Sequence, residues 1–119
     1  MSTTTRCVST RSRRCVPGIT ARAWWRQGIH QEFLGECGAV LFLTQVLQRM
    51  RPKYQDRSYR YGLLEAGHIG ENGYLAATSA GLGACGVGAF MDDAINDMLG
   101  VDGVEEAAVY ILAVGHRTT

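Results

Sequence analysis

The chain has 119 residues, 46 % of them hydrophobic, which is material for one modest domain with a single core. Its formal net charge of +1 argues against a dedicated nucleic-acid-binding or membrane-surface protein. No apolar run reaches the length of about 20 residues that a membrane span needs. The four cysteines form no CxxC pair, so we expect no metal site and a reducing, cytoplasmic location.

The charge is divided unevenly along the chain. Residues 1–26 contain six of the twelve basic residues and no acid, whereas residues 27–119 contain the other six and all eleven acids, a net charge of −5. The first segment is also rich in Ser and Thr, a composition typical of a disordered basic tail or of an organellar transit peptide. Because its only aromatic residues, Trp24 and Trp25, lie at its end, we favour a solvated tail over a nucleic-acid-binding arm.

The first element expected is a buried strand over residues 39–47, where the run AVLFLTQVL is largely apolar and rich in strand-forming residues. Pro52 and the charged cluster that follows it predict a loop over residues 53–60. From about residue 61 to residue 80, apolar and small residues recur at three- and four-residue steps, which predicts a helix.

The predicted helix has two unlike faces. One face carries Leu64, His68, Glu71, Leu75 and Thr78. The other, here called the small-residue seam, consists of Ala66, Gly70, Gly73, Ala77 and Ala80. Glycine inside a helix costs about 1 kcal/mol relative to alanine, so we expect the seam to let another backbone approach closely. The polar residues Glu65, His68 and Glu71 are interpreted as hydrogen-bonding groups of the helix surface rather than metal ligands.

Glycines end this helix and open the next element. Gly81 and Gly83 suit the turn that ends a helix, and the segment 84–90 (ACGVGAF) predicts a short strand over which another group packs closely. With Gly86 these glycines satisfy the GxGxxG dinucleotide motif, but that motif must follow a strand and open a helix. Here it closes a helix, where the dipole has the wrong sign for phosphate, so we reject dinucleotide binding.

The remaining elements complete a sheet covered by helices. Asp92 or Asp93 is expected to cap a helix that buries Ile95, Met98 and Leu99 and ends at Gly100. The apolar run AAVYILAV over residues 107–114 predicts a last buried strand.

Three blocks of the chain, in order, read KYQDRSYRYGLLEAGHIGENGYLAATSAGLGACGVGAF, DDAINDMLGVDG and AVYILAVGH. Together they make the region from Gln31 to His116 resemble the C-terminal half of nitroreductase-superfamily flavoproteins, in particular SagB-type azoline dehydrogenases. The resemblance implies an α+β fold in which a central mixed or antiparallel sheet is flanked by helices, with residues 27–119 forming a partial domain.

The same resemblance implies a function. FMN would lie at the interface of a homodimer and accept a hydride, and the substrate would be a small-molecule or peptide azoline. In that family the long central helix packs at the dimer interface, so the small-residue seam becomes the expected dimer contact.

Site residues follow from the resemblance as well. The expected flavin-edge residues, whose backbone N–H groups would approach N5 and O4 of the isoalloxazine, are Gly86, Val87, Gly88 and Ala89. Small residues suit this role because they let the backbone come close to the ring. His116 and Arg117 fall where related flavoproteins place a basic residue against the FMN phosphate, which a guanidinium can pair bidentately.

Lys53 and Tyr54 are similar to the Lys-Tyr pair that azoline dehydrogenases are thought to use in catalysis. Oxidation of an azoline to an azole removes a hydride and a proton, so a lysine of lowered pKa beside a phenol is chemically apt. Taken without the resemblance, both residues read as solvated members of a charged loop.

The N-terminal region departs from the family. Relatives build much of their phosphate site from an Arg-Ser-x-Arg segment followed by an aromatic residue and a long run of helices. The similar run at residues 11–14 (RSRR) lacks the aromatic residue and lies too close to the matching block, so we interpret it as coincidence. The chain is therefore expected to be half of an enzyme. The alternative to an FMN-dependent oxidoreductase is a truncated, non-catalytic remnant that only dimerises through its central helix.

Overall fold

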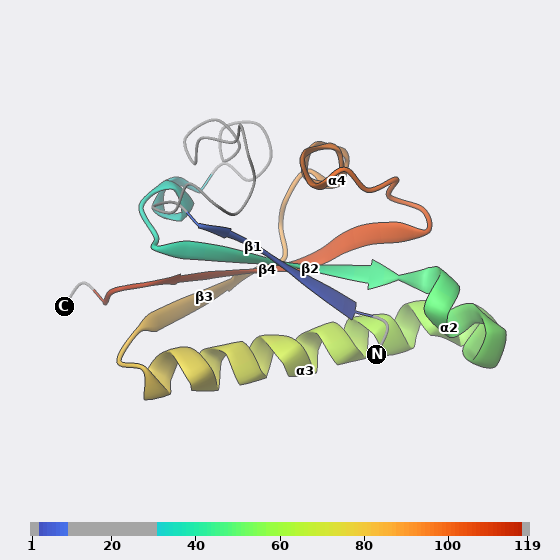
Figure 1. The fold of residues 1–119 in the computed structure, drawn as a ribbon, viewed down its shortest axis with the longest axis horizontal. Coiled ribbons are helices and arrows are strands. Elements are labelled where there is room, and N and C mark those ends of the chain that lie inside the picture. The colour runs from blue at the N-terminus through green and yellow to red at the C-terminus, as the bar shows by residue number, and fades with distance from the viewer. Residues whose placement is uncertain (1–2, 10–30, 118–119) are drawn as a thin grey trace.

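The computed structural model describes residues 3–9 and 31–117, and Figure 1 shows how their elements are arranged. The strands are β1 (Thr3–Ser9), β2 (Ala39–Val46), β3 (Gly83–Val87) and β4 (Glu106–Gly115). The α-helices are α2 (Leu47–Tyr54), α3 (Ser58–Ser79) and α4 (Asp92–Leu99). Two 3-10 helices, η1 (Glu32–Gly35) and η2 (Gln55–Arg57), precede β2 and α3.

The strands pair in the order β1-β2-β4-β3, and every pairing is antiparallel. The long helix α3 runs along one face of the sheet, while α4 and η1 lie on the other (Figure 1). This arrangement confirms the predicted α+β fold with a sheet flanked by helices, and it makes the sheet antiparallel throughout its described strands.

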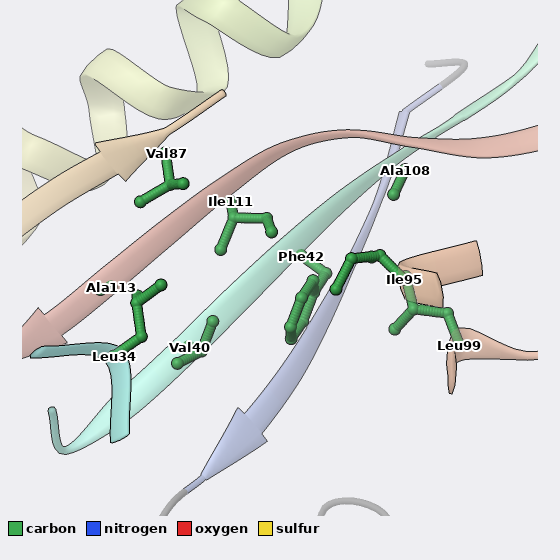
Figure 2. Close-up of a cluster of buried hydrophobic side chains, with 9 residues drawn as sticks. All are labelled: Leu34, Val40, Phe42, Val87, Ile95, Leu99, Ala108, Ile111 and Ala113. Carbon is green, nitrogen blue, oxygen red and sulfur yellow. The ribbon is translucent and has the colours of Figure 1, made fainter. Parts of the chain in front are cut away.

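The face of the sheet under α4 and η1 holds the apolar core (Figure 2). Phe42 and Ile111, from the two central strands, are fully buried there. They belong to one cluster with Leu34 of η1 and with Ile95 and Leu99 of α4. Burying a large apolar side chain contributes roughly 1.5–3 kcal/mol, so this face is a main source of the stability of the fold.

A bulge in β4 changes which of its side chains point toward the same face. Leu43 lies opposite Tyr110, whereas its neighbour Thr44 lies opposite Ala108. The extra residue in β4 reverses the alternation of side chains, so Ala108 also points into the core. Asn96 of α4 is buried and accepts the backbone N–H of Ala108 at 2.8 Å. A polar side chain thus satisfies a backbone donor inside the core.

The first turn of α3 is fastened to β2 by another buried polar side chain. Gln45 is only 2 % exposed, and its Nε2 donates to the carbonyl oxygen of Ser58 at 2.9 Å. Gly62 makes room for this contact, because a Cβ at that position would collide with the Gln45 side chain.

The small-residue seam packs against the chain's own sheet. A Cβ on Gly70 would lie 2.5 Å from Cε1 of Tyr110, and one on Gly73 would collide with Leu112. Ala66 and Ala77 of the seam are buried as well. Close approach does explain why the helix tolerates its glycines, but the approaching group is the sheet of the same chain. The prediction that the seam is a dimer contact is therefore wrong.

Residues 47–57 are helical where the sequence predicted the end of a strand and then a loop. Pro52 lies inside α2 and removes one backbone donor from it. The bond lost is the one that a residue 52 N–H would make to the carbonyl of Gln48. The helix ends at Tyr54, where the N–H of Gln55 donates to the carbonyl of Arg51. Helix α3 then begins at Ser58, three residues earlier than predicted.

The ends of α4 match the prediction only in part. Gly100 ends the helix in the left-handed region, with φ 70°, as expected. Its N-cap is Met91, however, and no side chain caps the helix. Asp92 and Asp93 lie in the first turn instead, where their carboxylates interact favourably with the helix dipole.

The N-terminal region is described only over β1, whose backbone pairs with β2 from Thr3 opposite Gln45 to Ser9 opposite Ala39. A strand thus stands where the sequence predicted part of a disordered tail. The RSRR run and the two tryptophans lie outside the described residues, and the division of the chain at residue 26 stays a prediction. No helix in the described ranges is long and apolar enough to cross a membrane.

Candidate functional site

An exposed pair of residues, Gly88 and Ala89, follows the edge strand β3. Before the pair, Val87 is only 3 % exposed, and after it Phe90 packs against the apolar core. The pair is therefore held at both ends while it faces solvent. Neither N–H takes part in the backbone hydrogen bonds that the described turns and loops form. A Cβ on Gly88 would meet nothing within 4 Å, so the backbone can offer donors to a ligand with room beside it.

The four predicted flavin-edge residues have different surroundings. Strand β3 ends at Val87, three residues before the predicted end, and the Val87 side chain belongs to the core. The N–H of Gly86 donates to the hydroxyl of Tyr74 on α3 at 2.5 Å. Gly86 and Val87 are thus engaged by the fold itself, while Gly88 and Ala89 are the ones whose backbone is open to a ligand.

Two tyrosines that sequence reasoning passed over lie beside Gly86. Tyr110 of β4 is hydrogen-bonded through its side chain to Tyr74. Burial, followed by the interactions with Tyr74, raises the pKa of Tyr110. A Cβ on Gly86 would collide with the Tyr110 hydroxyl and lie 2.9 Å from that of Tyr74. The signal for this cluster was present but weak: Tyr74 directly follows Gly73 of the seam, and Tyr110 interrupts an apolar strand.

The basic pair proposed for the phosphate lies elsewhere. His116 and Arg117 are exposed and follow β4, whose last residue pairs with the first residue of β3. The Arg117 side chain reaches Gly83, where a Cβ would lie 3.2 Å from its Cγ. Strands rise about 3.3 Å per residue, so Gly83 and Gly88 stand roughly 16 Å apart. The structure therefore does not bring the basic pair next to the open backbone.

The Lys-Tyr pair lies at the end of α2, in the corner that leads into α3. Nζ of Lys53 stands 5.1 Å from the centre of the Tyr54 ring, and that ring meets Tyr61 edge to face with centroids 5.0 Å apart. Both Lys53 and Tyr54 are exposed. Gln55, which follows them, adopts φ 50°, a conformation that costs a residue other than glycine of order 1–3 kcal/mol.

The outer face of α3 leaves two large apolar side chains uncovered. Leu64 and Leu75 are 56 % and 60 % exposed. Between them, His68 uses Nδ1 in a 2.7 Å hydrogen bond with the carbonyl oxygen of Leu64 on its own helix. This face, opposite to the seam, is the one that a second chain could cover.

Comparison with known proteins decides the family. The model of the nitroreductase family matches residues 11–116. The chain belongs to the nitroreductase family. It is 36 % identical over 89 residues to the protein named "Putative nitroreductase MJ1384" of Methanocaldococcus jannaschii, covering 75 % of this chain and 43 % of the relative. The chain thus spans less than half the length of that nitroreductase relative.

Several solved structures share the fold. A nitroreductase homologue from Anabaena variabilis is 40 % identical, with a TM-score of 0.65 over 74 % of this chain and 18 % of the other. The NADPH:FMN oxidoreductase of Vibrio harveyi, solved with NAD+, has a TM-score of 0.75 at 19 % identity, over 99 % and 51 % of the two chains. The E. coli microcin synthetase McbBCD complex with truncated pro-MccB17 has a TM-score of 0.67 at 23 % identity, over 72 % and 32 %. The last two likenesses concern the fold alone.

Proposed function

We propose that this chain is part of an FMN-dependent oxidoreductase whose flavin edge is the Gly88–Ala89 backbone. Membership of the nitroreductase family supports an oxidoreductase, and the Vibrio harveyi enzyme of the same fold is an FMN oxidoreductase by name. The observation that carries the proposal is the exposed backbone pair, anchored by Val87 and Phe90 and open beside Gly88. The residues present therefore fit the edge of a flat ring.

Bound FMN would supply a two-electron acceptor for a hydride. The role of the chain is to hold the ring edge with backbone donors that need no reorganisation as negative charge develops there. Gly88 and Ala89 are suited to it because neither presents a large side chain between backbone and ring. Val87 and Phe90 fix the pair through the core, which keeps the two N–H groups in place.

Arg117 and His116 remain our proposed partners of the FMN phosphate. Since the Arg117 side chain packs beside Gly83, it would act from the opposite end of β3 to the ring edge. An Arg117→Ala variant tests this role, with an expected loss of about tenfold in FMN affinity from one charge-assisted hydrogen bond of roughly 1.5–3 kcal/mol. Equal affinity in variant and parent would rule the residue out.

The substrate we propose is an azoline, with Lys53 as the base that takes the ring proton and Tyr54 beside it. The fold is shared with a microcin synthetase, and Nζ of Lys53, which would act as the neutral amine, stands 5.1 Å from the centre of the Tyr54 ring. Lys53 is the only lysine in the chain, which makes its removal unambiguous. Lys53→Ala should lower azoline oxidation by about 100-fold or more with FMN affinity unchanged. Arg57→Ala, an exposed cation in the next turn, is the matched control.

We also propose a homodimer in the cytoplasm, formed through the outer face of α3. The two leucines Leu64 and Leu75 would supply its apolar centre. The double variant Leu64→Asp, Leu75→Asp should sediment as a monomer and keep its helical circular dichroism. Val104→Asp, at an equally exposed apolar residue in the turn before β4, should leave the assembly unchanged.

An absorbance titration with FMN tests the flavin proposal. The parent chain should give a saturable change in the flavin bands. Gly88→Val should keep the fold, because the backbone there has no positive φ and the new side chain meets open space. It should nonetheless weaken FMN binding by at least about tenfold, or ~1.4 kcal/mol. Gly67→Ala, also open but on α3, is the control. The proposal would be refuted if mixing the parent chain with FMN left the absorbance spectrum of FMN unchanged.

A further inference from the structure

The open backbone pair follows a strand that is fastened from outside the sheet. β3 is an edge strand, since it pairs only with β4 in the described sheet. Edge strands leave backbone N–H groups without a partner in the ladder. At Gly86 that donor finds the hydroxyl of Tyr74, which α3 presents from one face of the sheet.

Gly86 is suited to this contact because it has no side chain. A Cβ there would occupy the place of the Tyr110 hydroxyl and press on that of Tyr74. The two phenols come from different elements, α3 and β4, and are hydrogen-bonded to each other. The partly buried hydroxyl pair therefore joins the central helix, the central strand and the edge strand at one point.

This junction lies two residues before Gly88. We propose that Tyr74 and Tyr110 are positioning residues, a hydroxyl clamp on Gly86 that sets where the backbone of Gly88 and Ala89 stands. The proposal rests on the proposed function for its link to flavin, but the clamp itself is a property of the fold. Val87 packs into the core and Gly86 is held by the clamp, so the strand has little freedom to shift before the open pair begins.

The clamp is tested without any ligand by residue-resolved amide hydrogen exchange. Tyr74→Phe deletes one oxygen and leaves the ring, so the fold should persist. The Gly86 amide should then exchange about tenfold faster, as the loss of one hydrogen bond of ordinary strength gives. Tyr59→Phe, which deletes a hydroxyl from an exposed ring on the same helix, should leave Gly86 unchanged. Equal Gly86 exchange in Tyr74→Phe and parent would overturn the clamp.

The link to flavin is tested by FMN affinity and by the midpoint potential of the bound flavin in the same proteins. Tyr74→Phe and Tyr110→Phe should each weaken FMN binding by about fivefold and shift the potential, while Tyr59→Phe should do neither. Faster exchange at Gly86 with unchanged affinity and potential would overturn the positioning role and leave only a structural one. A parent chain that binds no FMN would overturn the proposed function and this link together, while the exchange measurement would still decide the clamp.

Discussion

The two faces of the sheet are covered in opposite ways. Under α4 and η1, large apolar side chains such as Phe42 and Ile111 fill the space between layers. Under α3, glycines let the helix come down onto the tyrosine, leucine and glutamine side chains of the sheet, and polar bonds fasten the contact. Packing on the first face depends on large apolar side chains. Packing on the second depends on glycines, whose lack of a side chain leaves room for the sheet's side chains. The candidate site follows β3, which both faces hold: Val87 from the apolar side and Gly86 from the polar side.

The largest effect is expected on the apolar face. Phe42→Ala removes a fully buried aromatic side chain and should lower the free energy of unfolding by about 3–5 kcal/mol. Phe33→Ala, at a residue 41 % exposed, should cost far less. Urea unfolding followed by circular dichroism measures both. A similar cost for the two variants would mean that the core does not lie under α4 and η1.

The packing of α3 on the sheet should be destabilised by a larger side chain at a seam glycine. Gly70→Leu places a side chain where even a Cβ would lie 2.5 Å from the Tyr110 ring, so it should cost about 2 kcal/mol or more. Urea unfolding measures the loss and sedimentation the assembly. If the variant kept its stability and only lost a dimer, the seam would be an intermolecular contact after all.

Alkaline pH should weaken both faces through one partly buried group on each. Burial raises the pKa of the Cys37 thiol, which lies beside the apolar core, and that of Tyr110 under α3. As pH rises, the unfolded chain loses these protons before the folded chain does. The contribution of each group to the free energy of unfolding is therefore complete below its pKa in the unfolded chain, about 8.5 for the thiol and 10 for the phenol. It is lost as pH rises through the higher pKa of the folded chain. Urea unfolding from pH 7 to 10.5 should show the decline. Cys37→Ala should remove its first part and Tyr110→Phe its second, whereas parallel curves for all three proteins would contradict the assignment.

The smallest effect should be a gain on the outer face of α3. Gly67 is exposed, and a Cβ there meets nothing within 4 Å. Gly67→Ala should therefore raise the free energy of unfolding by about 0.5–1 kcal/mol through helix propensity alone. Thermal melting measures the gain. A loss of stability instead would show that this glycine, like those of the seam, faces a close neighbour.

The apolar face under α4 could be predicted from the sequence, because its residues stand in apolar runs and at helix-periodic apolar positions. The runs that became β2 and β4 and the buried positions Ile95 and Leu99 of α4 were all expected. The helix α2 was not, since Pro52 outweighed local helical propensity in the prediction. That the chain nonetheless continues as a helix through Pro52 to Tyr54 is visible only in the structure.

For the face under α3, the sequence predicted the small-residue seam but not what packs against it. Periodicity identified the small-residue seam, but smallness does not say which neighbour comes close, and the neighbour is Tyr110 and Leu112 of the same chain. The hydroxyl pair beside Gly86 could not be foreseen, because Tyr74 and Tyr110 are 36 positions apart and meet only through the sheet. Of the two glycines expected in the turn after α3, Gly81 ends the helix with φ 72°, whereas Gly83 has no positive φ and is the first residue of β3. The glycines thus close a helix and open a strand, as predicted.

The central claim is that FMN meets the backbone of Gly88 and Ala89. Amide chemical shifts recorded during a titration of the full chain with FMN test it most directly, with Gly67 on the far side of α3 as internal reference. We predict that the chemical shifts of the Gly88 and Ala89 amides move together and saturably while that of Gly67 stays unchanged. Saturable binding that moves other amides and leaves these two unchanged would contradict it.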